Sequence, residues 1–410
     1  MTDDLARRRV TVLFRLVLAI PHLLWLGLFG IAAVMLSFVA WLAVLFEGRV
    51  PATVHRFLAS YVRYTVHLTA YLALAAGPYP AFTGGTPYPV DVEIDPPARQ
   101  GRLAAGFRLV LMVPAALLSS VLAGSGAFGP FWGVGAAFLT GSLALVAGFL
   151  GWFAALARGR MPRGLRDAAA FAIGYGAQTS AYALLVTDRY PDATPGRVQP
   201  EPVLPRHPIA TAVRDDLVRP RLIVAFRGLL SIPHLLWLAL WGVAALLAAV
   251  VAWVLALVLG RVPRVLHRFL AAFVRANVHL YAFLFVVGRP FPGFVGREGS
   301  YPVDVTIAPP GRQRRLGVLF RLVLLVPALL VVSAYWSVLL VVAVLGWFAA
   351  LVTGRMPGGI RDLGVAALRY HAQASGYAFL LTSRYPDSSP ALAGRPVAAA
   401  EAPPSPEPAA

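Results

Sequence analysis

The sequence contains no cysteine and no lysine, and only 13% of its 410 residues are charged. Without cysteine there is no disulfide, no thiol nucleophile and no cysteine-ligated metal. A soluble domain carries about 25% charged residues. The low charge, together with 59% hydrophobic residues and a mean hydropathy of +0.71, is typical of a membrane protein.

Motifs of known enzyme classes are also missing. The chain has no glycine-rich phosphate loop, no G-x-S-x-G and no H-E-x-x-H. We therefore expect no enzymatic activity, no cofactor and no metal site.

Acidic residues are scarce, and the net charge is +18. In a soluble chain this excess of arginine would suggest nucleic acid binding. Here most arginines flank apolar segments, which favours contact with anionic lipid headgroups. The expected partners are therefore membrane lipids, with a membrane protein or a second copy as further candidates, and no nucleic acid.

Four long stretches carry no charged residue. They lie between Arg15 and Glu47, Arg108 and Arg158, Arg227 and Arg261, and Arg321 and Arg355. A spanning helix needs about 20 apolar residues, so each stretch is long enough. The basic cluster Arg7 to Arg9 resembles the start of a signal peptide, but the apolar run behind it is far longer than the roughly 7–15 residues of a cleavable one. We expect an uncleaved, multi-pass protein of a bacterial inner or plasma membrane.

The second half of the chain repeats the first. "AIPHLLWL" at Ala19 returns as "SIPHLLWL" at Ser231, and "YPVDVEIDPP" at Tyr88 returns as "YPVDVTIAPP" at Tyr301. The spacing is 212 to 213 residues, which indicates a tandem duplication.

Each half divides again into two quarters with a common pattern. "FRLVLAIP", "FRLVLMVP", "FRGLLSIP" and "FRLVLLVP" begin at Phe14, Phe107, Phe226 and Phe320, and a later G-R-x-P ends at Pro51, Pro162, Pro263 and Pro357. An aromatic residue followed by proline stands 28 residues after each of those prolines, at Tyr79, Tyr190, Phe291 and Tyr385. Each quarter is therefore predicted to be a long apolar helix, a tight turn and a second helix of fixed length.

We predict an all-α polytopic membrane protein with about eight transmembrane helices and short β-strand segments outside the membrane. The expected units are residues 1–100, 101–192, 216–311 and 312–388 for the quarters, 193–215 for a proline-rich linker and 389–410 for a disordered tail. Because each quarter crosses twice, all four turns are expected on one side, with a pseudo-two-fold axis along the membrane normal and both termini in the cytoplasm.

Two segments depart from plain helices. "YPVDVEI" and "YPVDVTI" alternate apolar and polar residues, which predicts strands that pair across the halves. The stretch "GSGAFGPFWGVGAAFLTGS" interrupts the second quarter and predicts either a re-entrant helix or a hydrophobic loop.

The ends of the second and fourth quarters carry a family resemblance. "GRMPRGLRDAAAFAIGYGAQTSAYALLVTDRYP" from Gly159 and "GRMPGGIRDLGVAALRYHAQASGYAFLLTSRYP" from Gly354 resemble the bacterial membrane family called domain of unknown function 4389. The resemblance supports the architecture and implies no activity. The first and third quarters depart from it, with Arg56 and Arg268 in place of the aspartate and no D-R-Y-P ending.

Charge alternates in sign five residues after each turn proline, at Arg56, Asp167, Arg268 and Asp362. A lone charge in the membrane costs at least about 2.5–3.5 kcal/mol, whereas an arginine–carboxylate pair satisfies both groups. Arg56–Asp167 and Arg268–Asp362 are therefore candidate clamps. The alternative is that each side chain reaches headgroups or water by itself.

A polar residue also stands 16 residues after each proline, at His67, Gln178, His279 and Gln373. With Arg63 and Arg275 these residues form a candidate polar stripe within the helix bundle. The stripe predicts either a water-filled path or proton relay, or hydrogen bonds between helices. The leading functional expectation is a non-enzymatic membrane scaffold or accessory protein, and the alternative is a transporter or channel that uses the stripe.

Overall fold

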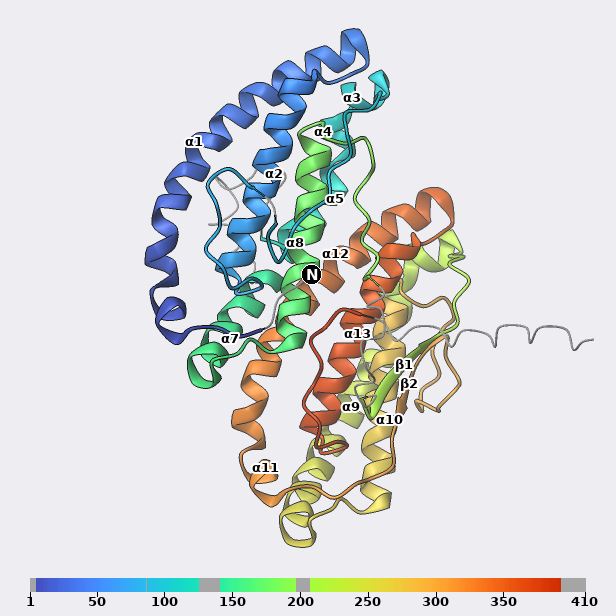
Figure 1. The fold of residues 1–410 in the computed structure, drawn as a ribbon. Helices are drawn as coiled ribbons and strands as arrows, with labels where there is room; N and C mark the ends of the chain where they lie inside the picture. The colour runs from blue at the N-terminus through green and yellow to red at the C-terminus, as the bar shows by residue number, and fades with distance from the viewer. Residues whose placement is uncertain (1–4, 86, 125–140, 197–206, 392–410) are drawn as a thin grey trace, which may run out of the picture.

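The computed structural model describes residues 5–85, 87–124, 141–196 and 207–391, and it is mostly helical with two short strands (Figure 1). The helices are α1 (Arg9–Glu47), α2 (Ala52–Leu72), α3 (Arg102–Gly106), α4 (Arg108–Leu111), α5 (Val113–Leu122), α7 (Leu143–Arg158), α8 (Arg163–Ala183), α9 (Arg221–Leu259), α10 (Arg264–Leu284), α11 (Arg315–Leu319), α12 (Arg321–Thr353) and α13 (Gly358–Ala378). The strands are β1 (Ile209–Val213) and β2 (Val303–Ile307). The predicted helical class is confirmed.

Long apolar helices are paired with shorter, more polar ones through tight turns. α1 ends at Gly48, whose φ of 71° is the left-handed conformation that terminates helices at low cost for glycine. Pro51 then caps α2 and fixes its entry. The second helices α2, α8, α10 and α13 each have 21 residues, which explains the fixed spacing between turn proline and aromatic exit.

The two quarters of each half run in opposite directions. The backbone N–H of Gln100, just before α3, donates to the carbonyl of Gly48 at the end of α1 (3.0 Å). The N–H of Arg7, just before α1, donates to the carbonyl of Gly159 at the end of α7 (2.8 Å). The residues just before the first helix of a quarter are its entry segment. Each entry segment thus pairs with the turn of the other quarter in the same half.

The same exchange occurs in the second half, where Gln313 donates to Gly260 and Arg219 donates to Gly354. The turns of neighbouring quarters therefore lie at opposite ends of a half. This differs from the expectation that all four turns share one side. The reason is that the connection from α2 to α3 runs back along the whole of α2 before the next quarter begins.

Three of the described helices are long and apolar enough to cross a membrane, namely α1, α9 and α12. In the second quarter the apolar sequence is divided among α3, α4, α5 and α7. The glycine-rich insertion lies mostly outside the described residues. The second helices do not qualify as spans by hydropathy.

The two strands pair with each other, antiparallel, with Ile209 opposite Ile307 and Val213 opposite Val303. The strand pairing expected across the halves is therefore wrong. β1 comes from the segment that we had assigned to the linker, and residues 90–94 form no strand.

The buried core is built on the second helices. Its main cluster includes Leu58 of α2, Ala168 of α8, Leu270 of α10 and Leu363 of α13, all fully buried. α12 packs on α5 and α7 and so joins the halves. Figure 1 shows α1 as a long curved helix along one side of this core.

Candidate functional site: the polar residues of the helix layer

Each quarter buries an arginine against an aromatic ring. The arginine of the F-R motif lies over the ring of the residue at or near the end of the second helix, with its guanidinium carbon 4.1 to 4.4 Å from the ring centroid. The pairs are Arg15–Tyr71, Arg108–Tyr182, Arg227–Phe283 and Arg321–Tyr377. All four arginines are buried, and the pairing is a cation–π contact in a water-poor setting.

These arginines close the C-termini of the second helices. Arg15 donates to the carbonyls of Tyr71 (2.6 Å) and Ala76 (3.3 Å), and Arg321 donates to those of Tyr377 (3.0 Å) and Thr382 (2.9 Å). The last carbonyls of a helix have no partner within the helix and carry its negative dipole end. A buried cation at that place satisfies both requirements.

A second side chain also donates to a carbonyl just after the end of each second helix. The residue two places after the last turn is in the left-handed conformation although it is not glycine, at Leu74, Leu185, Val286 and Leu380. Its carbonyl accepts from a side chain of the entry segment, supplied by Arg7, Gln100, Arg219 and Gln313 respectively. The strain of such a residue persists only where its surroundings hold it, and here a buried donor does so.

This role of the F-R arginines was not predicted from the sequence, where the motif indicated only a repeat. The signal was present, because an arginine occurs in all four copies of an otherwise apolar segment.

The histidines of the polar stripe bond the chain's own connecting segments. His67 Nε2 lies 3.0 Å from Asp91 Oδ1, and His279 Nε2 lies 2.7 Å from Asp304 Oδ1. Their rings stack on Tyr88 and Tyr301, one on each. The Nδ1 atoms of both histidines are buried without a hydrogen-bond partner among the described residues.

Asp304 is held as a carboxylate. Burial acts to raise its pKa, but hydrogen bonds from His279 and from the N–H groups of Gly299 and Val305 outweigh burial, so the pKa lies below its ordinary value. The carboxylate therefore anchors the strand to α10.

The other stripe residues have the same kind of partner. Arg63 donates to the carbonyl of Val92 (3.4 Å), and Arg275 donates to that of Val305 (2.9 Å). The amide oxygens of Gln178 and Gln373 accept from the N–H groups of Asp192 (2.8 Å) and Asp387 (2.9 Å), and Gln373 also donates to Ile209 (3.1 Å). The stripe thus holds extended segments onto the helices.

The candidate clamps are not brought together. Asp167 bonds the neighbouring Arg166 (2.8 Å), and Asp362 bonds Arg361 (2.6 Å). Within the described residues, Arg56 and Arg268 form no ion pair and are exposed. The antiparallel quarters explain this. His55 at the start of α2 lies 3.1 Å from the carbonyl of Val186 at the end of α8, so Arg56 and Asp167 are at opposite ends.

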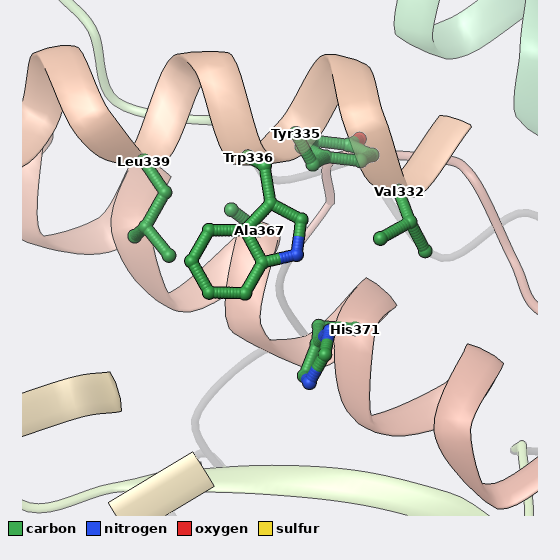
Figure 2. A pocket seen from close by; sticks show the side chains of 6 residues that line it. All are labelled: Val332, Tyr335, Trp336, Leu339, Ala367 and His371. Atoms are coloured by element: carbon green, nitrogen blue, oxygen red, sulfur yellow. The ribbon is translucent and has the colours of Figure 1, made fainter. Parts of the chain in front are cut away.

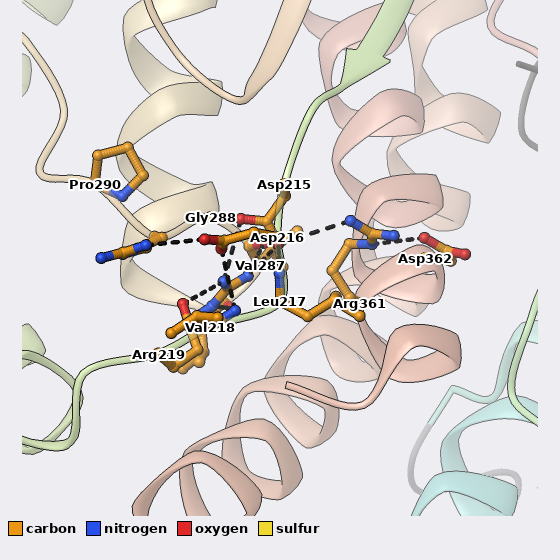
Figure 3. Close-up of polar contacts among 12 residues, drawn as sticks. Asp215, Asp216, Leu217, Val218, Arg219, Val287, Gly288, Pro290, Arg361 and Asp362 are labelled. Atoms are coloured by element: carbon orange, nitrogen blue, oxygen red, sulfur yellow. Dashed lines mark hydrogen bonds and ion pairs between the residues drawn. The ribbon is translucent and has the colours of Figure 1, made fainter. Parts of the chain in front are cut away.

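A buried ion cluster joins the entry segment of the third quarter to α13 (Figure 3). Asp215 accepts two bonds from Arg219, at 2.7 and 3.1 Å, and lies 3.7 Å from Arg361. Beside it, Asp216 pairs with Arg289 at the surface (2.9 Å). This cluster was not predicted from the sequence, because Asp215 and Arg361 are 146 positions apart in the chain.

A small hollow lies between α12 and α13 and is lined by Tyr335, Trp336 and His371 (Figure 2). It leaves no room for a bound small molecule, whose pockets usually measure roughly 300–1,000 Å³. Among the described residues no group of three or more histidines and carboxylates is arranged to hold a metal.

Comparison with known proteins supports the resemblance seen in the sequence. Searches of curated proteins and of solved structures gave no match. The family model "Domain of unknown function (DUF4389)" matches residues 9–83, 130–193 and 315–388, which together cover just over half of the chain. The chain therefore belongs to the family described as Domain of unknown function (DUF4389), as a protein with repeated units of it.

Proposed function

We propose that this protein is a non-enzymatic membrane scaffold or accessory protein. The observation that carries the proposal is the use of its polar groups: His67, His279, Gln178 and Gln373 all bond the chain's own connecting segments. Groups that hold the fold together in this way are not free to bind a transported substrate.

The membrane partner is inferred from the surface. α1 and α9 present long apolar faces, and exposed arginines lie at the helix ends, where anionic headgroups attract them. A membrane protein partner or a second copy would use the remaining surface.

The repeated text supports a tandem duplication of a two-quarter unit. Eight spanning helices would also require α2, α8, α10 and α13 to cross the membrane. These are the more polar helices, so we assign the lipid contact to the apolar helices and the inner layer to the second helices.

The rival function, transport through the stripe, is favoured by one observation. His67 and His279 each keep a buried Nδ1 without a partner in the described chain, and such a nitrogen is able to exchange a proton with a neighbouring water.

Cysteine accessibility separates the two functions. Because the chain has no cysteine, His67→Cys and His279→Cys can each be treated in native membranes with a membrane-impermeant maleimide, with the exposed Arg160→Cys as the control. We expect the control to react and the stripe positions to resist. Reaction at both stripe positions, together with substrate or proton flux in liposomes, would favour the transporter.

A further inference from the structure

The charge-free parts of α1, α9 and α12 are longer than a membrane crossing requires. They hold 31, 32 and 32 residues (16–46, 228–259 and 322–353), which is about 46 to 48 Å of helix. The hydrocarbon core is about 30 Å thick. To fit it, these helices would need to tilt by about 50°, beyond the roughly 0–40° of transmembrane helices.

The side of α2 on which the connecting segment lies is unsuited to contact with lipid. Residues 88–100 run as an extended chain beside α2, from Asp91 opposite His67 to Gln100 at the turn before α2. Among the described residues, positions 89–98 form no backbone–backbone hydrogen bond, and Glu93 and Asp95 are exposed. A lone extended segment cannot face hydrocarbon, because its peptide groups would lack partners.

The third connection follows the same path. β2 lies along α10 through His279–Asp304 and through Arg275, which donates to Val305, and the segment ends at Gln313 beside Gly260. It differs in that the backbone of β2 pairs with β1, so the need for water applies to the segment along α2.

The outer faces of α1 and α9 have the opposite character. Exposed apolar residues follow the same 7, 4, 3, 4 spacing on both helices and so form one stripe on each. The stripes are Val17, Leu24, Leu28, Ile31 and Met35 on α1, and Leu229, Leu236, Leu240, Val243 and Leu247 on α9.

Arginines gather at both ends of each half. One end of the first half exposes Arg49, Arg56, Arg99 and Arg102, and the other exposes Arg8, Arg9, Arg158, Arg160 and Arg163. Basic residues in short loops mark the cytoplasmic side. If the half crossed the bilayer end to end, one of these clusters would lie on the wrong side.

We propose that the protein inserts from one side into a single anionic leaflet. The long helices lie near the membrane plane with the stripes of α1 and α9 among the acyl chains, the arginines of both ends contact headgroups, and the connecting segments face water. This inference rests on the membrane assignment made above and adds the orientation.

The test compares two exposed positions near the starts of α2 and α8, at opposite ends of the first half: Arg56→Cys and Arg163→Cys. Each variant is expressed in bacteria and treated with an impermeant maleimide in intact spheroplasts and in inverted membrane vesicles. One-sided insertion predicts reaction of both in inverted vesicles and of neither in spheroplasts. Reaction of the two positions from opposite sides overturns it. Arg264→Cys and Arg355→Cys repeat the test in the second half.

Two further readouts separate the possible failures. Release of the wild-type chain from membranes by alkaline carbonate would contradict the membrane assignment itself, whereas retention with opposite-side labelling would contradict only the orientation. Leu236→Cys in the α9 stripe should react only after detergent is added. Reaction without detergent, or a disulfide-linked dimer through this position, would show that water or a second copy covers the stripe instead of lipid.

Discussion

Arg15 lies over the ring of Tyr71 and donates to the carbonyl of the same residue at 2.6 Å, so one side chain contacts both the ring and the backbone of its partner. The ring contact recurs in every quarter. The bond to the carbonyl of the same residue recurs at Phe283 and Tyr377, whereas Arg108 donates to the carbonyl of Thr187 instead.

Removing this arginine should destabilise the protein strongly. Arg15→Met removes the side-chain donor to the buried carbonyls of Tyr71 and Ala76 and the cation over the Tyr71 ring, and we expect a loss of about 2–5 kcal/mol in the free energy of unfolding. Thermal unfolding of the purified protein in detergent measures it. The exposed Arg264→Met is the control and should change stability by less than about 0.5 kcal/mol. Equal effects of the two substitutions would contradict a structural role for Arg15.

The ion cluster allows a comparison of neighbouring aspartates. Asp215→Asn leaves the guanidinium of Arg219 buried with a weaker partner, for which we expect a loss of about 3–5 kcal/mol. Asp216→Asn removes an exposed pair with Arg289 and should have a much smaller effect, because water screens it. Urea unfolding of both variants checks the order. A larger loss of unfolding free energy for Asp216→Asn than for Asp215→Asn would contradict the burial of the Asp215–Arg219 pair.

The anchor at Asp304 should make stability depend on pH. Its pKa in the folded protein lies below the ordinary 3.8, so the carboxylate contributes stability that is present above that pH and is lost as the pH falls through the folded pKa. Asp304→Asn should cost about 1–3 kcal/mol at pH 7. Its difference from wild type should shrink below about pH 4. A difference that stays constant down to pH 2 would exclude the charged anchor.

Two glycines of the third connection test how closely it lies on α10. A Cβ at Gly296 would lie 2.7 Å from the nitrogen of Ala276 and closer still to the carbonyl of Ala272. At Gly299, where φ is also positive, a Cβ would meet nothing within 4 Å. We expect Gly296→Ala to free the connection for cleavage by a protease, whereas Gly299→Ala carries only the backbone penalty of about 1–2 kcal/mol. Equal protection from cleavage would mean that the connection does not contact α10 here.

The sequence predicted the long helices α1, α9 and α12 and the four second helices, but not the division of the second quarter or the arrangement of the helices. Charge-free stretches and the G-R-x-P turns predicted the pairing of long and short helices, because both are local features. The opposite direction of neighbouring quarters depends on the path of residues 77–100, which contacts His67 and then Gly48. No local pattern specifies such a path, and the clamp between Arg56 and Asp167 was inferred without it.

The candidate site shows the same division. The spacing from the turn proline identified His67 and His279 as exceptional, and both lie in polar contacts. Their partners, Asp91 and Asp304, belong to segments that were expected outside the membrane. The identity of a polar residue is visible in the sequence, but the depth of its partner is set by tertiary packing.

Because each entry segment bonds the turn of the neighbouring quarter, a quarter cannot be separated from that neighbour without losing these bonds. The backbone of one turn is satisfied by the quarter that follows or precedes it, as when Gln100 serves Gly48 and Arg7 serves Gly159. A single quarter produced alone would have to obtain these bonds from a second copy of itself. A half is thus the smallest unit that supplies these bonds within itself, and we expect a chain with a single quarter to obtain them only as a symmetric dimer.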